Sequence, residues 1–337
     1  MNAAERVVRA IDGLQQRSEP VAFVVGVVKK FGDDRGTMLS ALLTYYGFMA
    51  LFPMLLLATT ILGYVGNRTI ENSIIGQTLR QFPVYGEQIG RDAAHPLTGN
   101  VFGLVFGLLG LLYGSLGIAQ SGQHAMSQIW NVPGVLRPGF IPRLGRSMLL
   151  YLTMAAAMLL SAAASVTVTI AGRGFVVRVL ALLAALVINV VLYVGVFRVL
   201  TPREIALRDL VVGAVLGGVG YTILLTVGTA LVQHQLRHAQ AVYGQFGFVL
   251  GLIGWIYLVA QITLYAAEVN VVRERRLWPR GIVQPPLTDA DKRVLHDIAR
   301  QEERRPEQRV GVGFGPDAPA EAGRDADHPE PRKDPDH

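Results

Sequence analysis

The chain has 337 residues, of which 51% are hydrophobic and only 17% are charged. Soluble domains usually carry about 25% charged residues, so this composition favours a membrane protein. The absence of cysteine excludes disulfides, thiolate metal sites and cysteine nucleophiles. The net charge is +6, but the basic residues cluster at the ends of apolar runs, as in membrane proteins, rather than in a patch that would bind nucleic acid.

Residues 1–38 are expected to form a cytoplasmic or interfacial N-terminal segment. No short apolar core follows a basic start, so a signal peptide is not expected. The apolar run Pro20–Phe31 is too short to span a bilayer. Two interpretations stay open for it. It is either an interfacial helix that places Lys29 and Lys30 near anionic headgroups, or a helix packed on a bundle.

Six uncharged apolar runs, each of 19 residues or more, predict an all-α, polytopic membrane protein with six transmembrane helices in one bundle. Lys and Arg residues in the short flanking segments number 16 on one side and 6 on the other, which predicts that both termini are cytoplasmic. The bias towards Arg, Ala, Val and Gly is interpreted as that of a GC-rich bacterial genome. The predicted transmembrane domain covers residues 39–270, with spans at about 39–65, 101–121, 147–171, 179–197, 210–232 and 246–267.

Three segments lie outside the spans. In the outer loop 66–100, apolar residues at helical spacing from Ile70 to Phe82 predict an amphipathic helix, which either rests on the bundle or forms a lid. Residues 271–305 are expected to form a basic juxtamembrane segment and a short cytoplasmic helix, opened by a capping box at Thr288–Asp291 and reaching about Arg304. The tail 306–337 is rich in Pro, Gly and charged residues and is expected to be disordered.

Small residues are expected to bring the helices into close contact, because helices in a membrane associate by packing rather than by hydrophobic exclusion. The pattern supports one compact bundle and leaves the oligomeric state open. The Gly-x-x-x-Gly pairs are Gly103/Gly107, Gly110/Gly114, Gly213/Gly217 and Gly247/Gly251.

Polar residues recur at helical spacing in several spans and predict an uncharged polar seam along spans one, four, five and six. The seam is either a path for an amphiphile or a set of ordinary inter-helix hydrogen bonds. Pro53 is either a plain kink or part of a site lined by freed carbonyls. The candidates for a substrate path are Tyr45, Tyr46, Pro53, Asn189, Tyr193, Thr222, Thr226, Tyr257, Gln261, Tyr265 and Glu268.

Glu268 is the one carboxylate at the edge of a span. It is expected to pair with Arg273 or Arg198, to carry a coupling proton, or to reach water at the inner leaflet. No acidic pair lies inside the predicted spans, so the sequence does not favour an ion-driven pump.

Enzyme motifs are absent from the sequence. There is no P-loop, no G-x-S-x-G elbow and no cluster of carboxylates or histidines for metal-assisted hydrolysis, so neither a catalytic residue nor a metal or cofactor is expected. His234 and His238 lie four residues apart without a nearby carboxylate and are interpreted as surface residues.

Three segments together resemble the YihY/virulence factor BrkB family, which was once mislabelled as ribonuclease BN. They are LTYYGFMALFPMLLL after Asp33-Asp34, the segment QHAMSQIWNVP, and YGQFG…WIYL…AAEVN. The resemblance covers roughly residues 15–280, and the approach to the second span corresponds only loosely. It implies a bacterial inner-membrane protein with suggested roles in envelope lipid transport, and it implies no catalytic residues.

The function that these patterns favour is movement of a lipid or other amphiphile across or between leaflets of the bacterial envelope, with membrane lipids as partners. The alternative is a non-transporting scaffold that binds envelope proteins through its tail and outer loop, and a membrane enzyme comes third. Nucleic acid is not an expected partner, and ribonuclease activity is not expected.

Overall fold

A computed structural model of the chain describes residues 9, 12–65, 101–171, 174–201, 205–243 and 245–314, and all regular structure among these residues is helical. The chain divides into two compact units. The larger unit holds residues 27–130 and 138–275, and the smaller holds residues 1–26, 131–137 and 276–337. Helix α2 (Glu19–Asp33) begins in the smaller unit and ends in the larger one.

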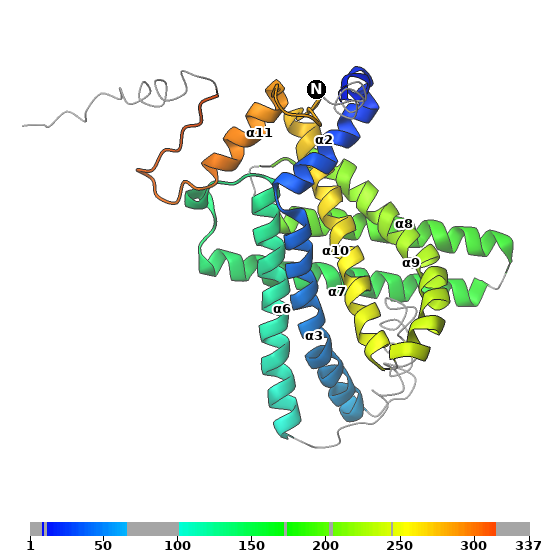
Figure 1. The fold of residues 1–337 in the computed structure, drawn as a ribbon. Helices are drawn as coiled ribbons and strands as arrows, with labels where there is room; N and C mark the ends of the chain where they lie inside the picture. Colours follow the sequence, from blue (N-terminus) through cyan, green and yellow to red (C-terminus); the bar gives the residue numbers. More distant parts are fainter. Residues whose placement is uncertain are drawn as a thin grey trace, which may run out of the picture. The chain divides into compact units, whose positions relative to one another are not determined.

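Six long helices make up most of the larger unit (Figure 1). Each of the six predicted apolar runs falls inside one of them, and each helix is longer than its apolar run. Helix continuation beyond the apolar run is expected where the flanking residues are good helix formers and find partners. The helices are α3 (Gly36–Val65), α6 (Val101–Ile129), α7 (Phe140–Ala171), α8 (Phe175–Leu200), α9 (Leu207–Tyr243) and α10 (Gln245–Arg275).

Four stretches within the described residues are long and apolar enough to cross a membrane. Each exceeds the roughly 20 residues that a helix needs to cross the hydrocarbon. The described first part of α3, Gly36–Leu51, is a shorter apolar helix. The four stretches are Phe140–Ser161, Phe175–Leu200, Leu207–Gly228 and Val249–Arg275.

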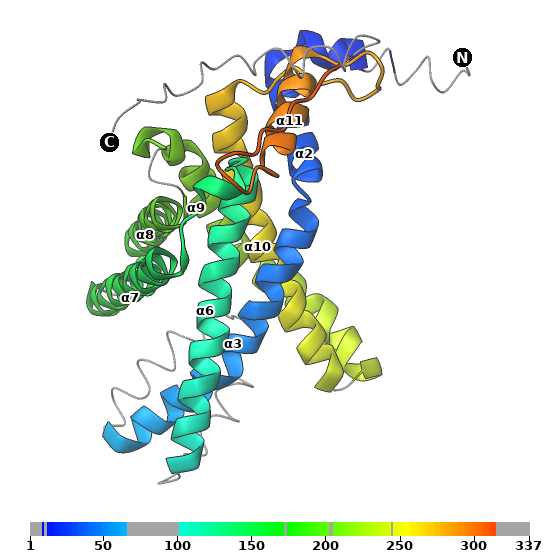
Figure 2. The ribbon, with the colours of Figure 1, turned by 90° about the vertical axis from the view of Figure 1, so that its left-hand side faces the viewer.

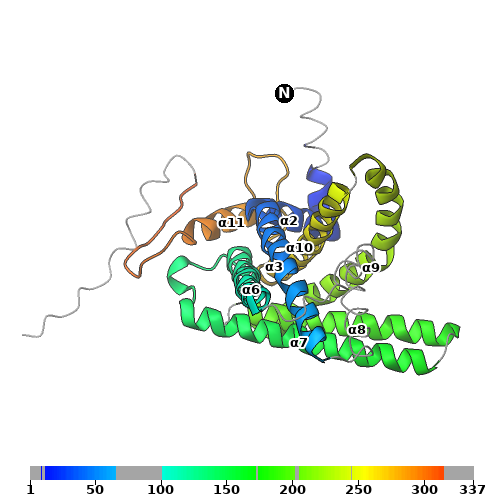
Figure 3. The ribbon, with the colours of Figure 1, turned by 90° about the horizontal axis from the view of Figure 1, so that it is seen from below.

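Each of the long helices of the larger unit packs against at least two others. α3 packs on both α6 and α10, α9 packs on α10 and α8, and α8 packs on α7. α6 and α7 also touch, over a smaller contact. Figures 1 and 3 show α7 and α8 running side by side as an antiparallel pair.

Glycines permit the closest of these helix contacts, as predicted. A Cβ atom at Gly114 would lie 2.8 Å from the Ala50 Cα atom, so α6 meets the backbone of α3 there. A Cβ atom at Gly217 would lie 2.6 Å from the Tyr193 ring and 3.2 Å from the Ala266 side chain. Such approaches exclude any side chain and explain why these positions are glycine.

α3 remains helical through Pro53. Figure 2 shows the later, light-blue part of α3 running in a different direction from its first part. Proline removes one backbone donor and crowds the carbonyl one turn earlier, which is a usual cause of such a bend. The side chain of Pro53 lies outside the described residues, as do the outer loop 66–100 and the tail from residue 315.

The smaller unit contains α11 (Asp289–Arg300), and its predicted capping box is confirmed. The Thr288 hydroxyl accepts a hydrogen bond from the Asp291 amide at 3.1 Å, and the Asp291 carboxylate accepts one from the Thr288 amide at 3.1 Å. The helix ends at Arg300, earlier than predicted. Backbone amides of Gly134 and Val135 donate to the Gln301 and Glu303 carbonyls at 3.2 and 2.9 Å, so the chain beyond α11 pairs with the loop 131–137 instead.

Candidate functional site

Polar side chains join three neighbouring helices of the larger unit, α8, α9 and α10. Asn189 Nδ2 donates to Thr222 Oγ1 over 3.0 Å, which links α8 to α9. The Tyr193 hydroxyl shares a hydrogen bond of 3.0 Å with the Thr263 hydroxyl, which links α8 to α10. Thr263 is not among the predicted path residues, because it does not share the spacing of Tyr257 and Gln261. These contacts place hydroxyl and amide groups between otherwise apolar helices.

The other predicted path residues form separate local groups. Gln261 Nε2 donates to the Tyr257 hydroxyl one turn away on α10, over 3.1 Å. Thr226 is exposed, and its hydroxyl donates to the Thr222 carbonyl on the same helix at 2.9 Å. Tyr45, 51% exposed, meets Tyr46 edge to face with ring centroids 5.2 Å apart. In the described part of the chain, the hydrogen bonds therefore do not link the predicted residues into one continuous line.

Three ionisable side chains meet inside the larger unit. Lys30, near the end of α2, has no exposed side-chain surface and pairs with Asp34 one turn later. Lys30 Nζ also lies 4.0 Å from Glu268 Oε2 on α10, and the Glu268 side chain is likewise fully buried. We call Lys30, Asp34 and Glu268 the ionic cluster. Its members come from α2, the turn that follows α2, and the distant helix α10.

The ionic cluster decides between alternatives that the sequence left open. Of the two interpretations of Pro20–Phe31, the packed helix agrees with the structure, because Lys30 is buried together with the face of α2 that carries Ala22, Val27 and Phe31. For Glu268, pairing with Arg273 or Arg198 and contact with water are both wrong, because its side chain pairs with Lys30 and has no exposed surface. The third alternative, a coupling proton, stays a prediction. The exposed apolar side chains of α2 are instead Val21, Val24 and Val28.

The C-terminal end of α6 receives two cations. Lys30 Nζ donates to the Ile129 carbonyl over 3.2 Å, and an Arg275 guanidinium nitrogen donates to the Trp130 carbonyl over 2.7 Å. The last carbonyls of a helix have no partner within it, and the helix dipole favours positive charge there. The ionic cluster is therefore held to α6 as well as to α2 and α10.

Neighbouring contacts fix the orientation of α10 around Glu268. Asn270 Oδ1 accepts a hydrogen bond of 2.6 Å from the Gly213 amide, and its Nδ2 donates to the Leu210 carbonyl at 3.1 Å. On the preceding turn the Tyr265 ring stacks on Phe31 of α2, with centroids 3.9 Å apart and planes 12° from parallel. Two contacts on different elements thus hold Glu268 facing Lys30.

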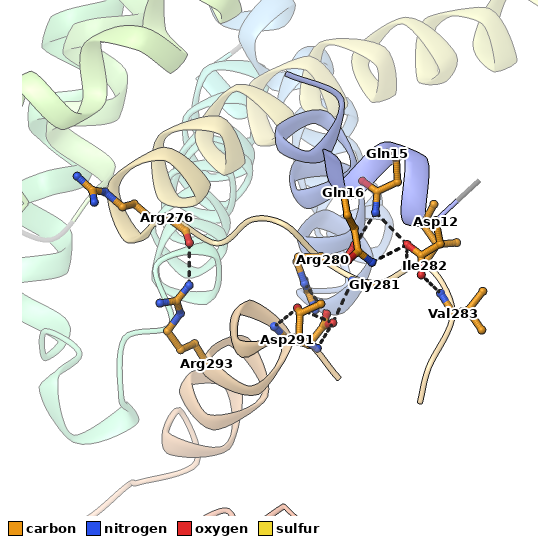
Figure 4. A network of polar contacts seen from close by, with 11 residues as sticks. Asp12, Gln15, Gln16, Arg276, Arg280, Gly281, Ile282, Val283, Asp291 and Arg293 are labelled. Carbon is orange, nitrogen blue, oxygen red and sulfur yellow. Dashed lines mark hydrogen bonds and ion pairs between the residues drawn. The ribbon is translucent and has the colours of Figure 1, made fainter. Parts of the chain in front are cut away.

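A second polar network lies in the smaller unit and was not predicted (Figure 4). The Asp12 carboxylate accepts hydrogen bonds from the Ile282 and Val283 amides at 3.0 and 3.3 Å. Gln15 Nε2 donates to both Asp12 and the Arg280 carbonyl, at 2.9 and 2.8 Å. This network joins the N-terminal segment to the segment that follows α10.

The Arg280 side chain carries a further part of this network. Its Nε donates to Asp291 Oδ1 over 2.8 Å, and both side chains are almost fully buried. The other Asp291 oxygen accepts the Gly281 amide at 3.1 Å. Arg280 was predicted only as part of the basic juxtamembrane segment 271–305. Its pairing depends on a carboxylate 11 residues away in a helix start, which spacing alone does not indicate.

We expect Asp12→Asn to increase hydrogen exchange at the Ile282 and Val283 amides. Burial of the Asp12 carboxyl acts to raise its pKa, but hydrogen bonds from Ile282, Gln15, Gln16 and Val283 outweigh it, so the pKa lies below its ordinary value of 3.8. A depressed pKa contributes stability that is present above the unfolded value and is lost as pH falls through the folded value. In the wild type, hydrogen exchange at the Ile282 and Val283 amides, corrected for the intrinsic exchange rate at each pH, should therefore rise below about pH 4.

The control for this prediction is Glu19→Gln, which alters an exposed carboxylate at the start of α2. It should leave both amides protected at every pH. Equal protection in the Asp12→Asn variant and the wild type at neutral pH would contradict the prediction, because the charged acceptor would then contribute nothing to local stability.

Among the described residues, no group of three or more His, Cys, Asp or Glu side chains is placed to hold a metal ion. The ionic cluster contains two carboxylates but also a lysine, whose ammonium group repels a metal cation.

Comparison with known proteins gives two relatives of low identity. The chain is 23% identical over 274 residues to the putative ribonuclease-like protein YfkH of Bacillus subtilis, which covers 76% of this chain and 96% of that protein. It is 24% identical over 321 residues to a UPF0761 membrane protein of Rhodospirillum centenum, which covers 88% of this chain and 67% of that protein. No solved structure matches the chain.

The model of the family described as virulence factor BrkB matches residues 27–286, which include the larger unit and the ionic cluster. A match over this much of the sequence shows that the chain belongs to the virulence factor BrkB family.

Proposed function

We propose that this BrkB-family protein is an integral protein of the bacterial inner membrane that moves a lipid or other amphiphile between leaflets. The observation that carries the proposal is the set of hydroxyl and amide contacts joining α8, α9 and α10. Within helices that are otherwise apolar, these groups offer hydrogen bonds to a lipid headgroup, while the apolar surface around them suits acyl chains. A headgroup that replaced the Asn189–Thr222 contact would exchange one hydrogen bond for another at little net cost.

The proposal includes six spans with both termini in the cytoplasm. Support comes from the smaller unit, in which the N-terminal segment, the loop 131–137 and the segment after α10 are hydrogen-bonded to one another. Segments that share hydrogen bonds must lie on the same side of a membrane. That requires an even number of crossings before residue 131 and again between residues 137 and 276. Two spans followed by four satisfy both conditions, and the excess of Lys and Arg on this side favours the cytoplasm.

Lipid scrambling in liposomes tests the transport function. We expect vesicles that contain the purified protein to lose more fluorescence of a labelled lipid, on quenching from outside, than protein-free vesicles do. Asn189→Leu and Gln261→Leu should slow the loss several-fold, because each removes an amide that would otherwise meet a headgroup. The initial rate of quenching at a fixed protein-to-lipid ratio measures the effect.

Thr153→Val is the matched control. The Thr153 hydroxyl on α7 donates to the Leu149 carbonyl of its own helix and lies outside the polar contacts of α8, α9 and α10. This variant should retain the wild-type rate. If folded wild-type protein leaves the quenching plateau at the protein-free level, unaided transport is wrong and a scaffold for envelope proteins becomes the better hypothesis. Ribonuclease activity is not part of the proposal, because the sequence lacks clustered carboxylates or histidines for metal-assisted hydrolysis.

A further inference from the structure

The ionic cluster brings together two carboxyl groups that the sequence places more than 230 residues apart. Asp34 is 6% exposed, and Lys30 and Glu268 are fully buried. Asp34 and Glu268 face the same lysine. Although no acidic pair lies inside the predicted spans, the fold creates one at the end of α10.

The charges in this cluster do not balance when every group is ionised. One ammonium and two carboxylates leave a net charge of −1 in a site without water contact at Lys30 or Glu268. Burying an uncompensated charge costs several kcal/mol, and a buried group usually becomes neutral instead. Binding of a single proton to the pair of carboxyl groups brings the net charge to zero.

Among the described residues, Lys30 is the one cation paired with Glu268, and the nearby Arg275 of α10 instead donates to the Trp130 carbonyl. α3 has no charged residue, and the single histidine of α6, His124, is exposed. From α6 the cluster receives the Ile129 carbonyl, which already accepts a hydrogen bond from Lys30. Asp209 in the first turn of α9 lies 3.7 Å from the exposed Arg208, and α2 carries two further carboxylates, the exposed Glu19 and the half-buried Asp33.

We propose that Lys30, Asp34 and Glu268 form a proton-binding site in which the two carboxyl groups hold one exchangeable proton, and that this proton couples a pH gradient to lipid movement. The coupling, though not the proton site itself, rests on the proposed transport function. Asp34 gives the pair its route to water, since it lies in the turn after α2 beside the exposed residue Arg35. Loss of the proton leaves the cluster negatively charged. The contact between α2 and α10 then becomes unfavourable, which gives the bundle two states that differ by one proton.

Infrared spectroscopy of the full chain in lipid bilayers tests the proton site. At neutral pH exposed Asp and Glu side chains are ionised, since their ordinary pKa values are about 3.9 and 4.3. A carboxylic acid C=O band at pH 7 therefore reports a carboxyl group held protonated inside the protein. We expect this band in the wild type and its loss in both Glu268→Gln and Asp34→Asn, because either amide removes the need for the shared proton.

Glu274→Gln is the control, because Glu274 lies on α10 but its side chain is 40% exposed. This variant should keep the band. Circular dichroism checks that each variant is folded. Absence of the band in the wild type, or its survival in both Glu268→Gln and Asp34→Asn, would overturn the proton site.

Lipid movement under an imposed pH gradient tests the coupling. We expect the rate in wild-type vesicles to change several-fold when the gradient is applied, and the rate in Glu268→Gln vesicles to be the same with and without it. Wild-type protein that moves lipid at one rate regardless of the gradient would overturn the coupling. If the wild type moves no lipid, the proposed transport fails, whereas the infrared band still decides whether the ionic cluster binds a proton.

Discussion

Lys30→Met is expected to lower the free energy of unfolding by about 3–5 kcal/mol, because it leaves two buried carboxyl groups without their cation. Methionine fills nearly the volume of the lysine stem, so lost packing contributes little. The variant also loses the hydrogen bond that Lys30 Nζ donates to the Ile129 carbonyl. Unfolding of the detergent-solubilised protein by denaturant, followed by circular dichroism, measures the change.

Two further variants separate the charge from other effects of the substitution. Lys29→Met alters the neighbouring, half-buried lysine on another face of α2 and should change stability by roughly 0.5 kcal/mol or less. Adding Glu268→Gln to Lys30→Met should restore part of the loss, since removal of one carboxylate relieves the uncompensated charge. Equal stability of Lys30→Met and Lys29→Met would show that the ionic cluster does not hold α2 to α10.

Gly213→Ala should destabilise the larger unit by about 3 kcal/mol or more, through overpacking and lost hydrogen bonds together. A Cβ atom at this position would lie 2.0 Å from the Ala266 carbonyl oxygen and 2.5 Å from Asn270 Nδ2. Backbone atoms cannot rotate away, so α9 and α10 must separate. That separation breaks the hydrogen bonds of Asn270 to the Gly213 amide and the Leu210 carbonyl.

Gly254→Ala provides the matched control, because a Cβ atom there meets nothing within 4 Å. In a helix, alanine is favoured over glycine by about 1 kcal/mol, so this variant should be as stable as the wild type or more so. The midpoint of thermal unfolding in the same detergent compares the two substitutions. The midpoint should fall for Gly213→Ala and stay the same or rise for Gly254→Ala. A similar effect of both would mean that the close approach of α9 to α10 at Gly213 is unimportant.

The local features of this protein could be predicted from its sequence. The uncharged apolar runs mark where helices form, because length and hydropathy are properties of a continuous segment. The capping box at Thr288–Asp291 lies within four residues and is confirmed. Gly213 and Gly217 meet neighbouring helices as predicted. The resemblance to the BrkB family, drawn from three short segments, is also confirmed.

The candidate site could be predicted only in part. Helical spacing correctly places Asn189 and Tyr193 on one face of α8, since periodicity is set within a single helix. It does not identify the partner of Tyr193, because Thr263 is brought to it by the packing of both α8 and α10 on α9. Residues that were grouped by spacing alone, such as Tyr257 and Gln261, bond to each other within their own helix.

Only the tertiary structure decided how the charged side chains are paired. The Lys30 contact with the Ile129 carbonyl joins residues 99 apart, and the contact of Gln15 with the Arg280 carbonyl joins residues 265 apart. A lysine at the end of a short apolar helix has the same local sequence whether it meets lipid headgroups or a buried glutamate. The sequence by itself determined which segments are helical and apolar. The folding of distant helices against one another determined which charges are removed from water, because burial depends on neighbours that local spacing does not specify.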